Sequence, residues 1–107
     1  MSIHADSRDS VYTIKLSDEF IRTNNDSKSL LSEIEKGKDH KTIRIDLSEL
    51  RYVDSSFADT LVMIRKRFPG IIQKIVLLNP TSAVEQMIYL VQFDKIFQIV
   101  RTQIPAF

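Results

Sequence analysis

Polar and apolar residues alternate in two segments of the chain, at residues 11–16 and 43–47. A period of two indicates strands that bury one face and leave the other polar. Two further segments are mostly apolar without such alternation. We expect residues 74–78 to form a central strand and residues 96–100 a last strand at an edge. A short additional strand near Ile3 would fit before the first of these.

Helical periodicity separates the strands. The first expected helix spans about residues 24–37, with N-cap candidates at its start, a short apolar stripe and Gly37 as its C′ residue. The second spans residues 56–68, where apolar residues recur at i, i+4, i+7 and i+11. The third spans residues 81–93, and Ser82 opens a Ser-x-x-Glu pattern typical of a capping box. The N-cap candidates of the first helix are Asn24, Asn25 and Asp26.

Strands that alternate with helices predict an α/β layer structure with right-handed crossovers. The strand faces that carry Thr13, Lys15, Arg44 and Asp46 are polar, so we expect a mixed, mostly parallel sheet with helices mainly on one face. A chain of 107 residues fits a single domain. We take residues 1–107 as that domain, with a core at about 11–100 and loose ends at 1–9 and 102–107.

Composition narrows the function. Hydrophobic residues make up 43% and charged residues 27% of the chain, as in ordinary globular proteins. A net charge of +1 gives no electrostatic reason to bind nucleic acid, and the basic run Arg65–Arg67 suits a solvated helix end. The absence of cysteine excludes disulfides and Cys-based zinc sites. Without a signal peptide or a long apolar run, we expect a cytoplasmic protein that does not insert into a membrane.

The candidate site is the triplet Asp54-Ser55-Ser56. A strand leads through a short loop to these residues, which stand at the start of an amphipathic helix. Ser56-x-x-Asp59 fits a capping box, so Ser56 is expected to cap the helix and to leave the hydroxyl of Ser55 available just outside the first turn. The spacing alone favours the simpler interpretation that all three polar residues only cap a helix.

A longer pattern surrounds the triplet: Asp-Leu-Ser-x-Leu-x-x-Val-Asp-Ser-Ser at residues 46–56, followed by an apolar helix. Further blocks stand at Leu77–Pro80, Ala83-Val84 and Phe93–Phe97. Together they resemble the STAS domain family, most closely the bacterial anti-sigma-factor antagonists, over about residues 11–100.

The resemblance implies a protein-binding switch. Ser55 would be phosphorylated by a partner serine kinase, and a separate serine phosphatase would reverse the modification. The unphosphorylated form would bind an anti-sigma factor or a switch-type serine kinase and release the target that this partner holds. The phosphosite neighbours and partner contacts expected from the resemblance and from the helix pattern are Asp54, Ser56, Phe57, Thr60 and Met63.

Thr60 and Met63 are placed in that surface because the helix pattern puts them opposite the core stripe. Two residues depart from the family pattern, since the family commonly has glycine where this chain has Phe57 and Gln92. Glycine lets a partner's backbone approach closely. Phe57 therefore either alters the docking geometry or belongs to the core.

Two other functions fit parts of the sequence. A receiver-type domain would phosphorylate an aspartate, with Asp46 and Asp54 near a strand end and Asp18-Glu19 as further Mg²⁺ ligands. A STAS subunit of a membrane transporter, including lipid transporters, would bind an ABC-type ATPase without a serine switch. We expect no catalysis, no metal and no cofactor, and a monomer when the chain is free.

Overall fold

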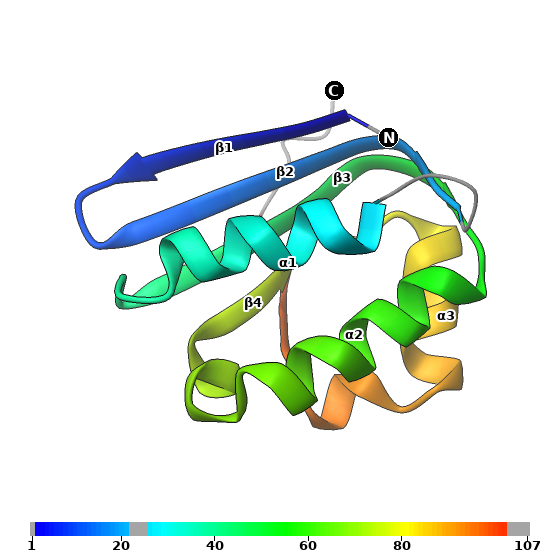
Figure 1. Cartoon of the computed structure of the whole chain (residues 1–107). Helices are drawn as coiled ribbons and strands as arrows, with labels where there is room; N and C mark the ends of the chain where they lie inside the picture. The colour runs from blue at the N-terminus through cyan, green and yellow to red at the C-terminus, as the bar shows by residue number, and fades with distance from the viewer. Residues whose placement is uncertain (1, 22–25, 103–107) are drawn as a thin grey trace.

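The computed structural model describes residues 2–21 and 26–102, and within them five strands form one sheet in the order β1-β2-β3-β4-β5 (Figure 1). β1 is antiparallel to β2, and every later neighbour is parallel. The sheet is therefore mixed and mostly parallel, as predicted. The strands are β1 (Ser2–Arg8), β2 (Val11–Phe20), β3 (Thr42–Val53), β4 (Ile75–Leu78) and β5 (Gln98–Val100).

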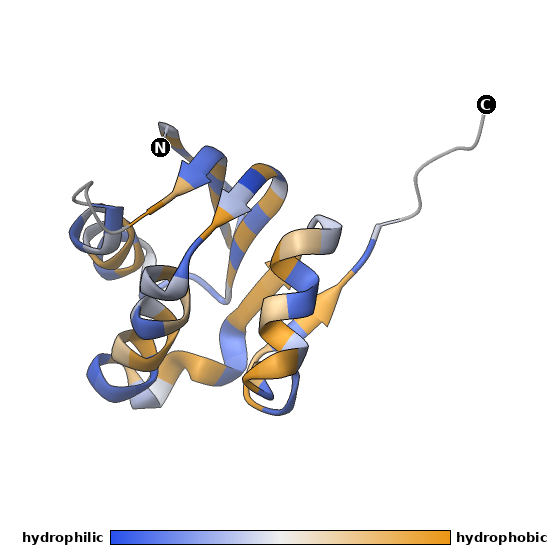
Figure 2. Ribbon diagram, turned by 90° about the vertical axis from the view of Figure 1, so that its right-hand side faces the viewer, coloured by the Kyte–Doolittle hydropathy of each residue, from blue (hydrophilic) through white to orange (hydrophobic). Residues whose placement is uncertain are grey.

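Three α-helices connect the parallel strands: α1 (Asp26–Gly37), α2 (Ser55–Arg67) and α3 (Ser82–Leu90). Two short 3-10 helices, η1 (Pro69–Lys74) and η2 (Phe93–Lys95), precede β4 and β5. Apolar and polar residues are mixed along the helices and the long strands, whereas β4 is apolar throughout (Figure 2). Most of the buried apolar residues of strands and helices belong to one core cluster, and Val76 and Leu78 of β4 are buried outside it. Thr13, Lys15, Arg44 and Asp46 instead line a shallow hollow on the other face of the sheet. The expected one-sided covering by helices is thus confirmed.

The strands differ from the expectation at both ends of the sheet. Residues 2–8 are not loose, because β1 pairs with β2 along its whole length. At the other edge, β5 is only three residues long because the chain before it forms η2. Residues 103–107 of the expected loose tail lie outside the described residues.

β3 is also longer than predicted, and no loop leads to the candidate site. Its pairing with β2 passes through two register shifts and continues to Phe20↔Val53. The strand pair therefore runs as far as Val53, and Asp54 alone separates β3 from α2. Because a paired strand holds the start of α2, the site stands on rigid structure.

Two helix ends were predicted for the wrong reason. Gly37 is the last residue of α1 and does not have a positive φ. A Cβ atom there would lie 2.3 Å from a ring carbon of Tyr12, so glycine is required by close packing. Burial and a hydrogen bond to Glu33 raise the pKa of the Tyr12 hydroxyl to about 12.

The start of α3 also differs from the prediction. The N-cap is Thr81, not Ser82, and the Thr81 hydroxyl donates a hydrogen bond to the Leu50 carbonyl instead of capping the helix. For α1, Asn24 and Asn25 lie outside the described residues, and Asp26 is the first helical residue.

Candidate functional site

Asp54 is the junction between the sheet and α2. Its backbone N–H donates to the carbonyl of Phe20 at 3.1 Å, which ties the junction to the end of β2. Its own backbone is extended, and its carboxylate Oδ1 accepts a hydrogen bond from the Ser56 N–H at 2.8 Å. Asp54 is therefore the N-cap of α2, because its side chain satisfies one of the N–H groups that a helix start leaves without a partner.

The prediction that Ser56 caps α2 is wrong, because the N-cap is Asp54. Ser56 lies inside the first turn, is 8% exposed, and its hydroxyl donates to the same Asp54 oxygen. Aspartate caps helices as well as serine does, and here it comes first along the chain. Ser55 is the first residue of α2 and is exposed. The expected difference between an exposed Ser55 and a tied Ser56 is present, although Asp54 performs the capping.

Phe57 lies beneath this first turn and belongs to the core. Its side chain is fully buried and packs edge to face against Phe20, with ring centroids 5.2 Å apart. Of the two roles that the sequence left open for Phe57, the structure therefore shows the core residue and not the exposed partner contact. The Phe57 ring fills the space between the start of α2 and the end of β2.

The expected exposure of Thr60 is wrong. Thr60 is fully buried, and its hydroxyl donates to the Ser56 carbonyl at 2.7 Å and contacts the hydroxyl of Ser27 on α1. Thr60 stands three residues after Phe57 and four before Ile64, and residues at this spacing share one face of a helix. Helical spacing therefore places Thr60 beside the core stripe and not opposite it, and the contact with α1 completes its burial.

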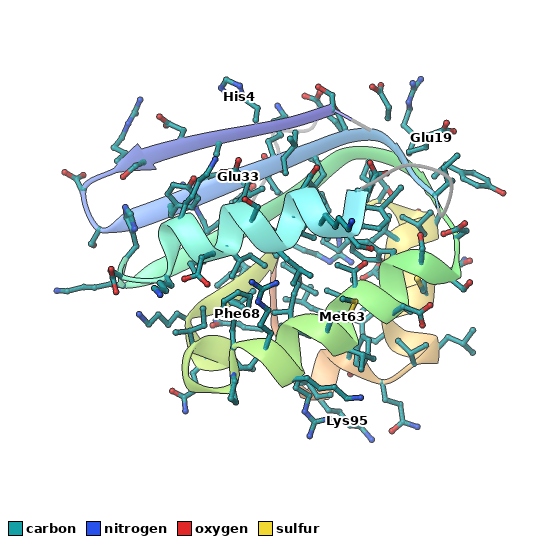
Figure 3. All side chains as sticks on the ribbon, viewed as in Figure 1. His4, Glu19, Glu33, Met63, Phe68 and Lys95 are labelled. Atoms are coloured by element: carbon teal, nitrogen blue, oxygen red, sulfur yellow. The ribbon has the colours of Figure 1, made fainter. Side chains whose placement is uncertain are left out.

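Met63 is exposed as expected, with 45% of its surface accessible (Figure 3). It stands eight residues after Ser55, which is a distance of about 12 Å along the axis of α2.

Tyr52 lies beside the site and was not predicted as a site residue. Its side chain is 60% exposed. Alternation with the buried Leu50 would have placed the Tyr52 ring inside, and the register shifts in the β2–β3 pair break that alternation.

The charges along α2 are divided. Asp54 and Asp59 stand near its start, and its last turn carries Arg65, Lys66 and Arg67. Negative charge at the start of a helix and positive charge at its end both suit the helix dipole.

Within residues 2–21 and 26–102, no three acidic or histidine side chains gather as a metal site would require. The receiver-type alternative needs such a cluster, and Asp46 lies on the open sheet face while Asp18 pairs with Arg51.

Chemically, the site offers a primary alcohol at a helix N-terminus. Ser55 is exposed at the first position of α2, where backbone N–H groups and the dipole favour a nearby anion. The residues around it hold the backbone by capping and packing. This arrangement is suited to accept a charged group without disturbing the fold below it.

Comparison with known proteins places this geometry in a family context. A family model described as the STAS domain matches residues 2–103. No curated protein sequence matches the chain. None of the helices in the described part of the chain is long and apolar enough to cross a membrane.

Three solved structures have a similar fold. The anti-sigma factor antagonist SpoIIAA in its unphosphorylated form is 15% identical, with a TM-score of 0.70 over 95% of this chain and 89% of that one. The Bacillus cell fate determinant SpoIIAA in the phosphorylated form is 13% identical, with a TM-score of 0.68 over 95% and 92%. A candidate anti-sigma factor antagonist of Thermotoga maritima, tm1081, is 21% identical, with a TM-score of 0.76 over 95% and 87%.

Proposed function

We propose that this chain, which belongs to the STAS domain family, is a phosphorylation-controlled protein-binding switch of the anti-sigma-factor-antagonist type. The observation that carries the proposal is Ser55, an exposed serine at the first position of α2, directly after the capping Asp54. SpoIIAA, which has the same fold, exists in an unphosphorylated and a phosphorylated form. Ser55 is the acceptor in our proposal.

In this proposal the partner is an anti-sigma factor or a switch-type serine kinase, and a serine phosphatase restores the binding form. The chain itself is a monomer when free, acts in the cytoplasm, and performs no catalysis. Ser56 is not the acceptor in our proposal, because it is buried and its hydroxyl donates a hydrogen bond to Asp54. The interface includes Ser55 and extends along α2 to Met63, whereas Phe57 and Thr60 support it from inside.

Phosphorylation would act on the interface and leave the fold unchanged. A phosphate adds about −1.5 to −2 charges at pH 7, and at the start of α2 the helix dipole favours such an anion. Burying the phosphate against a partner, next to Asp54 and Asp59, would instead combine desolvation with repulsion between like charges. The modified form would therefore be folded and unable to dock.

The test is affinity capture from cell extract with wild type, Ser55→Ala and Ser55→Glu as baits, followed by mass spectrometry. We expect one protein, a serine kinase or an anti-sigma factor, on the first two baits and its loss on the third. Ser82→Glu is the matched control, because Ser82 is likewise the exposed first residue of a helix. Phosphopeptide mapping of the chain after reaction with the captured kinase should find phosphate on Ser55.

Two outcomes would contradict the proposal. Phosphate found only on Ser56 would refute the assignment of the acceptor. Recovery of an ABC-type ATPase in equal amounts on all baits would indicate a transporter subunit in which Ser55 has no switching role.

A further inference from the structure

An exposed surface lies beside the site at the end of the β2–β3 strand pair. It consists of Asp18 and Glu19 on β2 and Arg51 and Tyr52 on β3, and we name these four residues the β2–β3 tip. They line an open hollow of about 590 Å³. Figure 3 places Glu19 at the end of the molecule where β3 passes into α2. The tip and Ser55 therefore lie at the same end of the domain.

The backbone of the tip is specially shaped. The β2–β3 register shifts between Lys15 and Ser17 and again between Asp18 and Glu19. Asp18 has a φ of 72°, in the left-handed region that aspartate enters more readily than most non-glycine residues do. Bulges of this kind are concentrated at functional sites, where they change the direction of a side chain.

The result of this shape is an aromatic ring outside the core. Arg51 and Tyr52 are consecutive and both exposed, although neighbours on a regular strand point to opposite faces. Arg51 Nη2 contacts Asp18 Oδ1 at 3.3 Å, which links the two strands beside the ring. With 60% of its surface accessible, Tyr52 contributes little to the core. Tyrosine is enriched among the residues that dominate binding energy at protein interfaces, and it loses little side-chain entropy when held.

We propose that Tyr52 is an anchor for the protein that binds at Ser55, and that this partner receives the ring in an apolar pocket. The inference rests on the proposed function, which supplies the partner. Tyr52 precedes Ser55 by three residues, so their Cα atoms are at most about 11 Å apart. An interface of about 800 Å² on each protein reaches roughly 16 Å from its centre. A partner centred on Ser55 is therefore wide enough to reach Tyr52.

The anchor would have a different role from the serine. Tyr52 carries no charge that phosphorylation changes, so its contact strengthens binding without discriminating between the two forms. For a partner that is a kinase, such a contact is made equally before and during phosphoryl transfer. Loss of the ring should then raise KM and leave kcat nearly unchanged.

The experiment measures Kd by calorimetry for the partner that the wild-type chain captures. We expect Tyr52→Ala to weaken binding at least thirtyfold, which corresponds to about 2 kcal/mol. Tyr52→Phe keeps the ring and should stay within threefold of wild type. Tyr89→Ala is the matched control, because Tyr89 is a half-exposed tyrosine on α3, outside the tip. Thermal melts of each variant verify folding, and Tyr52→Ser provides a second ring deletion.

Ser55→Glu measured in the same series separates the two proposals. Weak binding by both Tyr52→Ala and Ser55→Glu supports the anchor and the switch. Binding by folded Tyr52→Ala within threefold of wild type overturns the anchor, even when Ser55→Glu binds weakly. Weak binding by Tyr52→Ala with normal binding by Ser55→Glu supports the anchor and contradicts the switch. Equal losses in Tyr52→Ala and Tyr89→Ala would also overturn the anchor, because the effect would not belong to the tip.

Discussion

At the scale of single residues, the first turn of α2 depends on one carboxylate. Asp54 Oδ1 accepts both the backbone N–H and the hydroxyl of Ser56, and the Asp54 backbone N–H is bonded to β2. Ser55 stands beside this carboxylate with an exposed side chain. The adjacent residues of the triplet thus differ, because Asp54 and Ser56 are joined by hydrogen bonds that hold the turn and Ser55 is exposed.

This difference predicts unequal effects of alanine at the three positions. Asp54→Ala removes the cap and leaves a buried Ser56 hydroxyl without that acceptor, so it should lower the free energy of unfolding by about 1–2 kcal/mol. Ser56→Ala should cost about 1 kcal/mol through the lost hydrogen bond. Ser55→Ala should change the free energy by less than about 0.5 kcal/mol. Urea unfolding curves measure all three, and a loss at Ser55 as large as that at Asp54 would show that Ser55 is structural.

The backbone conformation at Gln92 explains why the family commonly has glycine at this position. Its φ is 61°, so the usual glycine at this position suits a left-handed turn between α3 and η2. Close approach of a partner, the reason that the sequence suggested, is not needed to account for it. Gln92 holds the turn at a cost in strain, and its side-chain oxygen accepts a hydrogen bond from Lys95 at 3.3 Å.

Gln92→Gly should therefore raise the free energy of unfolding by about 0.5–1 kcal/mol, because relief of left-handed strain exceeds the entropy that glycine adds to the unfolded chain. Gln86→Gly is the matched control, since Gln86 is exposed inside α3 and glycine there should destabilise by about 1 kcal/mol. Chemical denaturation should show opposite signs. A destabilising Gln92→Gly would mean that the Lys95 contact outweighs the strain.

At the scale of elements, periodicity predicted the strands and the helix that bury one apolar face. The alternation at 11–16 and 43–47 located β2 and β3, and the apolar spacing from Phe57 located α2. It did not predict the end of β3, because two register shifts break the alternation before Val53. Long-range pairing between strands decides where β3 ends, and local patterns do not record it. Thr60 is a different case, because its spacing of three residues from Phe57 and four from Ile64 already places it beside the core stripe. Its contact with Ser27 on α1 completes its burial.

The candidate site was predictable to a similar extent. The motif identified Asp54 and Ser55, and the structure places them together at the start of α2. The local pattern could not decide which residue caps the helix, because aspartate and serine compete for that role. Tyr52 could not be found in this way, because its exposure results from the bulged pairing of two strands.

α2 offers one element-level test of the interface. Met63 is exposed on α2 and is an adaptable apolar contact. Met63→Asp should weaken partner binding at least tenfold, because a charge would be buried at the contact, and thermal melting should barely change. Leu90→Asp is the control, since Leu90 is an even more exposed apolar residue on α3 and should have little effect. Binding by Met63→Asp within twofold, about 0.4 kcal/mol, would remove this part of α2 from the interface.

At the scale of the whole molecule, the proposed switch needs no change of fold. Ser55 stands on a helix whose start is held by the sheet, by Phe57 beneath it and by the contact with α1. We therefore expect amide NMR spectra of the free phosphorylated and unphosphorylated chains to differ only near residues 52–60. Widespread shift changes on the sheet or on α3 would indicate a conformational mechanism instead.

The central claim is that phosphate on Ser55 excludes the partner, and calorimetry of both forms against the captured partner tests it most directly. A penalty of about 3 kcal/mol for burying an unpaired charge weakens binding more than a hundredfold. We predict that the Kd of the phosphorylated chain exceeds that of the unphosphorylated chain by at least this factor. Equal dissociation constants for the two forms would contradict the account.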